Sequence, residues 1–213
     1  MSQFAVIGLG RFGRSVCLEL MRLGHSVIGV DIEPKLVNPI ADELTHAVIA
    51  DATSEAALEE LNLKDCDAVV VAIGENLEAS LLCTLHLKTQ GVEDIRVKAV
   101  TPEHHRILSR LGISQIIHPE EDMGIRVAQA LNYPMVNAYI SIGHNQYVVE
   151  VRLSEKCDGK TIVDIVPESV HCLLLKQGEH LQPQPDVQTQ LSDHDTLVLV
   201  GDLKSLDKLA KVL

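Results

Sequence analysis

Residues 4–131 repeat one pattern six times: a short apolar run, rich in β-branched residues, is followed by a longer stretch whose apolar positions recur with helical spacing. Each short run is apolar nearly throughout, as expected of strands that are covered on both faces. Strands that alternate with helices predict a parallel sheet with helices packed on both sides. The predicted strands are residues 4–9, 26–31, 46–50, 68–73, 95–100 and 115–118.

Glycines mark the ends of several predicted helices. Gly24, Gly91 and Gly112 follow three of them, where a residue in the left-handed conformation commonly ends a helix. The segment after the second strand is less regular, because Pro39 would break a helix that began at Pro34. We therefore expect that helix to start late, with Asn38 as its N-cap and Pro39 at its first position.

The pattern changes near residue 132. Two strand-like runs flank Gly143-His144-Asn145, which indicates a β-hairpin, and the proline-containing segment 182–186 is expected to be a loop. The sequence thus predicts an α/β chain of two domains: a Rossmann-like domain with a six-stranded parallel sheet, residues 1–134, and a small α+β domain, residues 135–213. In the second domain strands are predicted at 136–142, 147–153, 170–176 and 196–201, and a helix at 203–212.

A glycine-rich motif, Gly8-Leu9-Gly10-Arg11-Phe12-Gly13, joins the first strand to the first helix. In such motifs the first glycine permits a tight turn, Gly10 lets phosphate approach the backbone, and Gly13 lets the helix pack closely. Asp31 ends the next strand, where a carboxylate accepts hydrogen bonds from ribose hydroxyls and repels a 2′-phosphate. The pattern favours an adenosine nucleotide or NAD over NADP; a glycine-rich turn with nothing bound is the alternative.

Three more groups of residues follow carboxyl ends of predicted strands, the edge at which such sheets bind ligands. They are Asp51-Ala52-Thr53, Ile73-Gly74-Glu75 and Lys98-Ala99. For Asp51 and Thr53, capping of the next helix is an equal alternative. For Glu75 the simpler interpretation is a solvated loop charge.

The last helix of the first domain starts with three acids, Glu120-Glu121-Asp122. Acids in a first turn usually complement the helix dipole. The functional alternative is that Glu120 coordinates a cation near nucleotide phosphates. His104-His105 and Cys83-x-x-His86 lack a companion pair at zinc spacing, so we expect no transition-metal site.

The charge balance restricts the partners. The chain has 30 acidic and 18 basic residues, a formal net charge of −12. A nucleic-acid binder needs a basic face, so neither nucleic acid nor a role as a DNA-bound redox repressor is expected. No apolar run reaches the roughly 18 residues of a membrane span, and we expect no signal peptide. Five cysteines without a CxxC motif indicate reduced thiols in the cytoplasm.

Six sequence blocks follow one another between residues 3 and 130: GLGRFGRSV, VIGVDIEP, ADATSEAAL, VAIGENLEASLL, VKAVTPEHHRIL and IIHPEEDMGIRVA. Together they resemble the RCK/KTN family, which combines TrkA-N and TrkA-C domains in the regulatory subunits of Ktr/Trk-type bacterial potassium uptake systems. Residues 136–213 resemble the C-terminal domain of that family in size and layout. His194-Asp195 stands where the family often has Gly-Asp, and Lys176-Gln177-Gly178 replaces Arg-x-Gly.

The resemblance implies a non-enzymatic cytoplasmic protein at the inner face of the membrane. Its copies would form dimers and an octameric ring beneath an integral-membrane potassium-translocating subunit, and ATP/ADP or NAD/NADH would gate ion flow. Arg11 would contact phosphate, Asp31 the ribose and Asp51-Ala52 the adenine, while Glu120 would hold a divalent or monovalent cation between nucleotides across a dimer. The implied nucleotide-binding residues are Gly8, Gly10, Arg11, Phe12, Gly13, Asp31, Ile32, Asp51, Ala52, Ile73, Gly74, Glu75, Lys98, Ala99, His104 and Glu120.

An NAD-dependent oxidoreductase is the competing interpretation. Such an enzyme needs a substrate domain that supplies a catalytic acid, base or nucleophile. Residues 136–213 show no evident candidate for these roles. The sequence therefore favours a nucleotide-sensing regulatory subunit.

Overall fold

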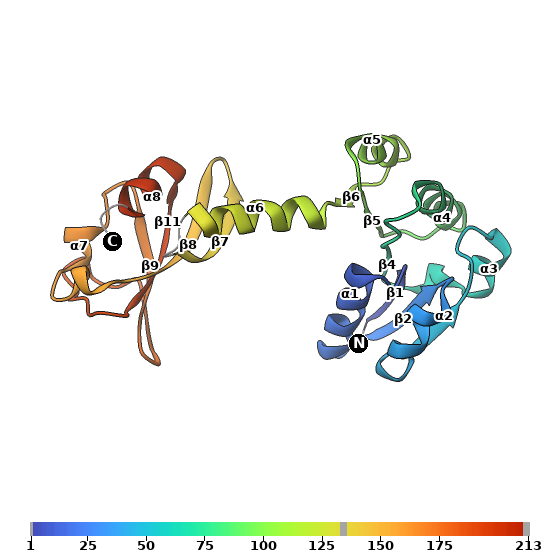
Figure 1. Cartoon of the computed structure of the whole chain (residues 1–213), viewed down its shortest axis with the longest axis horizontal. Helices are drawn as coiled ribbons and strands as arrows, with labels where there is room; N and C mark the ends of the chain where they lie inside the picture. The colour runs from blue at the N-terminus through green and yellow to red at the C-terminus, as the bar shows by residue number, and fades with distance from the viewer. Residues whose placement is uncertain (1, 133–135, 211–213) are drawn as a thin grey trace. The chain divides into compact units, whose positions relative to one another are not determined.

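The computed structural model describes residues 2–132 and 136–210 and places them in two compact units (Figure 1). The first unit ends at Glu120 and the second begins at Glu121. This division falls inside helix α6 (Pro119–Asn132), whereas the sequence analysis put the domain boundary at residue 134. Within the described ranges, no helix has the length and apolar character that a membrane span needs.

The first unit contains a six-stranded sheet with the order β3-β2-β1-β4-β5-β6. Every neighbouring pair of strands is parallel. The order reverses between β1 and β4, which is the topology of a Rossmann-like sheet. The predicted fold class is confirmed. The strands are β1 (Gln3–Ile7), β2 (Ser26–Asp31), β3 (His46–Ile49), β4 (Ala68–Val71), β5 (Ile95–Lys98) and β6 (Gln115–Ile117).

Helices cover both faces of this sheet. Successive side chains of a strand point to opposite faces, so the apolar central strands present a core surface on each side. Val6 of β1 packs into one apolar cluster with Cys17 of α1 and Ile40 of η1. Ile7, the next residue, packs into the opposite cluster with Cys83 of α4. The helical segments of the first unit are α1 (Arg11–Arg22), α2 (Pro34–Val37), η1 (Asn38–Glu43), α3 (Glu55–Glu60), η2 (Leu63–Asp65), α4 (Leu77–Thr89) and α5 (Pro102–Arg110).

The predicted glycine caps are confirmed, since Gly24, Gly91 and Gly112 have φ values of 83°, 83° and 78°. The predicted late helix start at Asn38 is wrong. Pro34 begins a single α-helical turn, α2, which ends before the chain continues as the 3₁₀ segment η1. Pro39 therefore lies in the first turn of η1, where its missing N–H removes no hydrogen bond from the preceding turn.

The second unit contains a five-stranded antiparallel sheet with the order β10-β9-β11-β8-β7. The predicted hairpin is confirmed: His144 and Asn145 form the turn with φ of 51° and 58°, the left-handed values of a tight hairpin turn. The elements are β7 (Val136–Gly143), β8 (Gln146–Arg152), η3 (Glu155–Cys157), α7 (Ile162–Ile165), β9 (His171–Gln177), β10 (His180–Pro183), β11 (Thr196–Asp202) and α8 (Leu203–Ala210).

The expectation of a loop over residues 182–186 is wrong for its first two residues. Gln182 and Pro183 end β10, and they pair with Leu175 and Leu174 of β9. β10 is the outer strand of its sheet, so the ring of Pro183 needs no N–H partner on the open side. The last residues of the predicted C-terminal helix, beyond Ala210, lie outside the described residues.

The close approach of Gly13 to Gly8 generates a stability prediction. A Cβ added to Gly13 would lie 1.8 Å from the carbonyl oxygen of Gly8, whereas one added to Gly10 would meet nothing within 4 Å. We expect Gly13→Ala to lower the free energy of unfolding by about 3 kcal/mol, because α1 must move away from the loop. Gly10→Ala is the control and should unfold like the original chain. Chemical denaturation followed by circular dichroism measures both, and equal midpoints would contradict this packing.

Candidate nucleotide-binding site

The glycine motif forms a turn between β1 and α1 whose three glycines have different surroundings. Gly8 has φ of 98°, and a Cβ on it would lie 2.9 Å from the carbonyl carbon of Ala72 on the neighbouring strand. Gly13 packs directly on Gly8, as described above. Gly10 alone faces open space. The turn therefore has one open backbone position between two that are closed by packing.

Gly10 is also the N-cap residue of α1, and no side chain caps this helix. The first turn of α1 holds no acidic residue. N–H groups at the start of a helix lack partners within the helix, and they carry a partial positive charge. The open side of Gly10 thus leads to donors that suit a phosphate group, and the residues present fit this ligand.

The carboxylate of Asp31 is held in place by two backbone N–H groups, one of them in the glycine turn. One carboxylate oxygen accepts a hydrogen bond from the N–H of Leu9 at 2.6 Å, and the other accepts one from the N–H of Glu33 at 2.9 Å. Each carboxylate oxygen can accept a second hydrogen bond. Asp31 can therefore receive a pair of hydroxyl groups without a change in its orientation.

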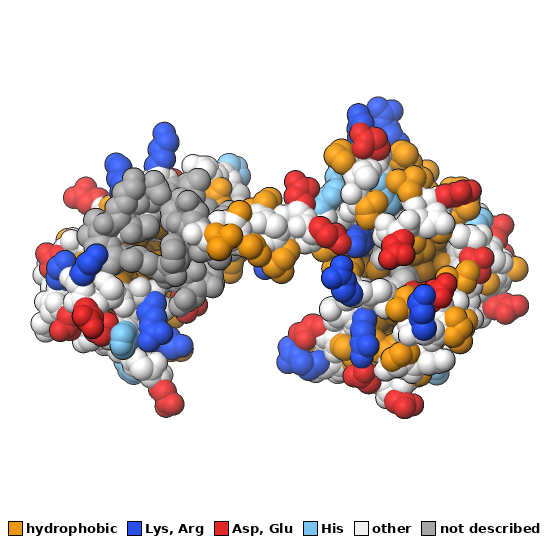
Figure 2. All heavy atoms as spheres, in the orientation of Figure 1, with side chains coloured by type: hydrophobic (Ala, Val, Ile, Leu, Met, Phe, Trp, Pro, Cys, Tyr) orange, Lys and Arg blue, Asp and Glu red, His pale blue; other side chains and the backbone are white. Residues whose placement is uncertain are grey.

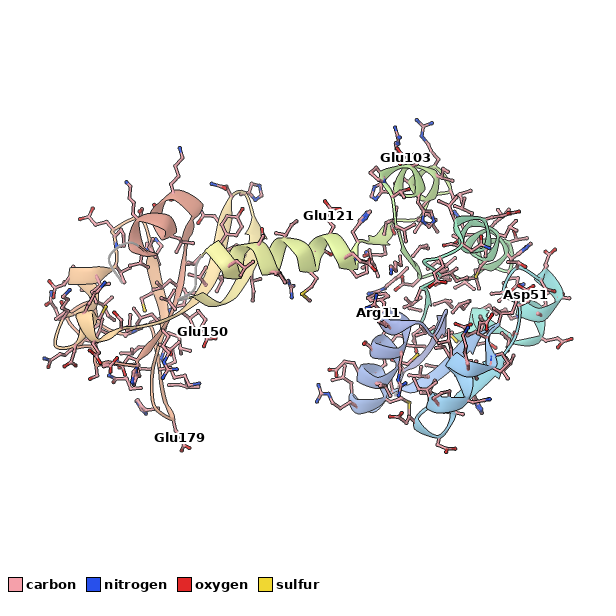
Figure 3. The ribbon with its side chains drawn as sticks, viewed as in Figure 1. Arg11, Asp51, Glu103, Glu121, Glu150 and Glu179 are labelled. Carbon is pink, nitrogen blue, oxygen red and sulfur yellow. The ribbon has the colours of Figure 1, made fainter. Side chains whose placement is uncertain are left out.

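Lys98 and Glu120 form an ion pair beside the same turn. Nζ of Lys98 donates to Oε1 of Glu120 at 2.5 Å and lies 5.8 Å from the centre of the Phe12 ring. A Cβ on Gly74 would be 3.3 Å from this Nζ, so the lysine also lies against the end of β4. Hydrogen bonding to Lys98 holds the pKa of Glu120 below its usual value, and the charge of Arg11 contributes in the same direction. Figure 3 labels Arg11 at the start of α1.

Asp51 does not cap the following helix. Its Oδ1 accepts from the hydroxyl of Thr53 at 2.7 Å and from the N–H of Thr53 at 2.9 Å, which lowers its pKa. The N-cap of α3 is Ser54 instead. The capping interpretation of Asp51 and Thr53 is therefore wrong, and the carboxylate stays at the exposed carboxyl end of β3 (Figure 3).

The remaining predicted residues differ in exposure. Ala52 and Ala99 are buried, Ile73 is half-buried, and Glu75 and Ile32 are exposed. His104, in the first turn of α5, is fully buried, and neither ring nitrogen has a hydrogen-bond partner among the described residues. Burial lowers the pKa of His104, and the charge of His118 lowers it further. The imidazole of His104 is thus uncharged at neutral pH.

The sequence analysis did not predict a contact between His105 and His118. Nδ1 of His105 and Nε2 of His118 are 2.8 Å apart, and the ring centroids are 5.0 Å apart. This pair joins α5 to the residue before α6. In the part of the chain that the structure describes, no three His, Cys, Asp or Glu side chains gather as a metal site. Glu120 could bind a cation only with ligands from elsewhere, such as phosphate oxygens.

The two segments that carry the departures from the family pattern, 176–178 and 194–195, contact each other through Gln177 and Asp195, which are not themselves the departing residues. Nε2 of Gln177 donates to Oδ2 of Asp195 at 2.8 Å, and the N–H of Ser192 donates to the same oxygen at 2.8 Å. Asp195 is buried. These residues therefore stabilise the loop that leads into β11.

Comparison with known proteins agrees with this geometry. Residues 4–119 match the TrkA-N domain family. The chain is 43% identical to Ktr system potassium uptake protein A of Bacillus subtilis over 211 residues, covering 97% of this chain and 94% of that protein. It is 36% identical to Ktr system potassium uptake protein C of the same organism, covering 98% and 96%.

Solved structures show the same fold. The GsuK RCK domain superimposes with a TM-score of 0.65 at 16% identity, covering 99% of this chain and 47% of that one. The GsuK channel bound to NAD gives 0.63 at 16% identity, covering 99% and 39%. From the match over the first unit and the identity with two full-length relatives, we conclude that the chain belongs to the TrkA-N domain family of potassium uptake proteins.

Proposed function

We propose that this chain is the nucleotide-sensing regulatory subunit of a potassium uptake system and catalyses no reaction itself. The observation that carries the proposal is the turn at Gly10, which is open to phosphate and has Asp31 anchored beside it. The full-length match to two Ktr system potassium uptake proteins supports the role in potassium uptake.

In this proposal each site residue contacts a different part of the nucleotide. Ribose hydroxyls donate to Asp31, the phosphates accept from the N–H groups at the start of α1, and Asp51-Ala52 lies beside the adenine. Arg11 forks onto the terminal phosphate. ATP and ADP are the proposed pair, with NAD and NADH as the alternative; one structure of similar fold, the GsuK channel, is bound to NAD.

Regulation requires a partner and two states. A nucleotide shifts an equilibrium between conformations only by binding them with different affinity. We infer that ATP and ADP differ through their contacts with Arg11 and through a cation held between Glu120 and the phosphates. The chain binds to the cytoplasmic side of an integral-membrane potassium-translocating subunit. The conformation that the bound nucleotide favours then controls that subunit.

An exposed apolar stripe on α6 supports assembly into dimers and a larger ring. Met123, Val127 and Leu131 are spaced four residues apart and are 55%, 52% and 77% exposed. Figure 2 shows hydrophobic side chains along this helix. Exposed apolar stripes of this kind commonly bind another protein surface. A second copy of the chain is the partner that we propose for it.

Asp31→Ala should weaken ATP and ADP binding by about 1–3 kcal/mol, the scale for the loss of charge-assisted hydrogen bonds. Titration calorimetry measures the affinity, and thermal melting shows whether the turn at Leu9 survives the loss of its acceptor. Asp42→Ala, an exposed acid on η1, is the control. Unchanged affinity in a folded Asp31 variant would refute the ribose assignment.

Arg11→Ala should weaken ATP binding about tenfold more than ADP binding, because a guanidinium that forks onto the terminal phosphate is lost only for ATP. Arg14→Ala is the matched control on the same helix, since Arg14 pairs with Glu43 at 3.4 Å. Calorimetry with both nucleotides provides the comparison. Equal losses for ATP and ADP would show that Arg11 does not sense the terminal phosphate.

Leu131→Glu should reduce the assembly state, because it puts a charge into the apolar stripe of α6. Multi-angle light scattering of the purified chain measures its mass. Val187→Glu, which changes an equally apolar exposed residue in the second unit, is the control and should leave the mass unchanged. If the original chain is a monomer at micromolar concentration, the assembly proposal is wrong.

A further inference from the structure

The Lys98–Glu120 pair is unequal in exposure. The side chain of Lys98 is 11% exposed, whereas that of Glu120 is 71% exposed. A buried ammonium group needs a negative partner, and in this structure Glu120 supplies it. The lysine is held by its surroundings, while the exposed glutamate can turn into water when another anion replaces it at Lys98.

Nζ of Lys98 lies close to the two turns that follow β1 and β4, and Glu120 is its ionic partner. The centre of the Phe12 ring lies 5.8 Å from Nζ, and a Cβ added to Gly74, in the loop after β4, would lie 3.3 Å from it. Phe12 and Gly74 belong to the two turns that flank the switch point of the sheet, where the phosphates of a bound nucleotide are expected. A phosphate bound at this switch point would therefore approach the ammonium group that Glu120 now pairs with.

We propose that Glu120 acts as an intramolecular competitor for phosphate at Lys98, and that nucleotide binding exchanges the glutamate for a phosphate oxygen. This inference rests on the proposed nucleotide site. In this inference Glu120 lowers the affinity for the nucleotide by occupying Lys98. This effect adds to any direct repulsion between the carboxylate and the phosphates. Because Glu120 lies in the first turn of α6, the exchange also releases the start of that helix from β5.

The test is a double-mutant cycle with ATP in EDTA, measured by calorimetry and, for weak variants, by competition. Glu120→Gln should tighten ATP binding about fivefold in the original chain, the scale of one lost partly exposed ion pair. In a Lys98→Met background the same change should give less than half of that gain. Glu121→Gln removes a charge one residue further on and is the control that should leave affinity unchanged.

Two outcomes of the cycle would overturn the inference. An equal gain from Glu120→Gln in both backgrounds would mean that the glutamate repels phosphate directly and not through Lys98. No gain in the original background would mean that Glu120 does not compete at all. If the original chain binds neither ATP, ADP nor NADH, with or without magnesium, the proposed function itself fails, which is a distinct result.

A second measurement does not depend on any variant. Amide hydrogen exchange of the unaltered chain in EDTA, with and without saturating ATP, follows the first turn of α6. Release of Glu120 predicts faster exchange at residues 123–126, the first N–H groups whose acceptors lie within α6, when ATP is present, against slower exchange in the glycine turn. Protection of both segments by ATP would contradict the exchange of partners.

Discussion

The contact between Gly13 and the carbonyl of Gly8 is the constraint on which the candidate site depends. It brings the start of α1 so close to β1 that no side chain fits between them. The same approach fixes where the first N–H groups of α1 point and leaves Gly10 as the open position. Asp31 then completes the turn by accepting from the N–H of Leu9. Two strands and one helix thus meet through backbone contacts, and the site needs few side chains to be formed.

Charge in the site is arranged around a mostly buried basic group and an exposed acidic group. Lys98 is enclosed by Phe12, Gly74 and Glu120, while Glu120 is mostly in water. In a chain with a net charge of −12, an anionic ligand is repelled at long range unless local basic groups compensate. Arg11 and Lys98 provide that compensation next to the start of α1, which lacks acidic residues and a side-chain cap.

The sequence was sufficient for the features that depend on local pattern. Apolar runs alternating with helical spacing predicted the sheet and its class, and the glycine motif predicted the turn. Features that depend on contacts between distant residues were missed. The Lys98–Glu120 pair spans 22 positions and the His105–His118 pair 13, and no periodicity marks either one. β10 was not predicted, because a proline such as Pro183 indicates a loop unless the strand is known to lie at the edge of a sheet.

The buried cysteines can show which packed layer of the molecule separates first. Burial raises the pKa of the Cys17 and Cys83 thiols to about 12, so neither reacts readily while its layer is closed. Cys17 belongs to the cluster on one face of the parallel sheet and Cys83 to the cluster on the other, while Cys157 is buried in the core of the second unit. An alkylating reagent would therefore label three separate layers at three separate rates, and the order of labelling would show which layer separates first.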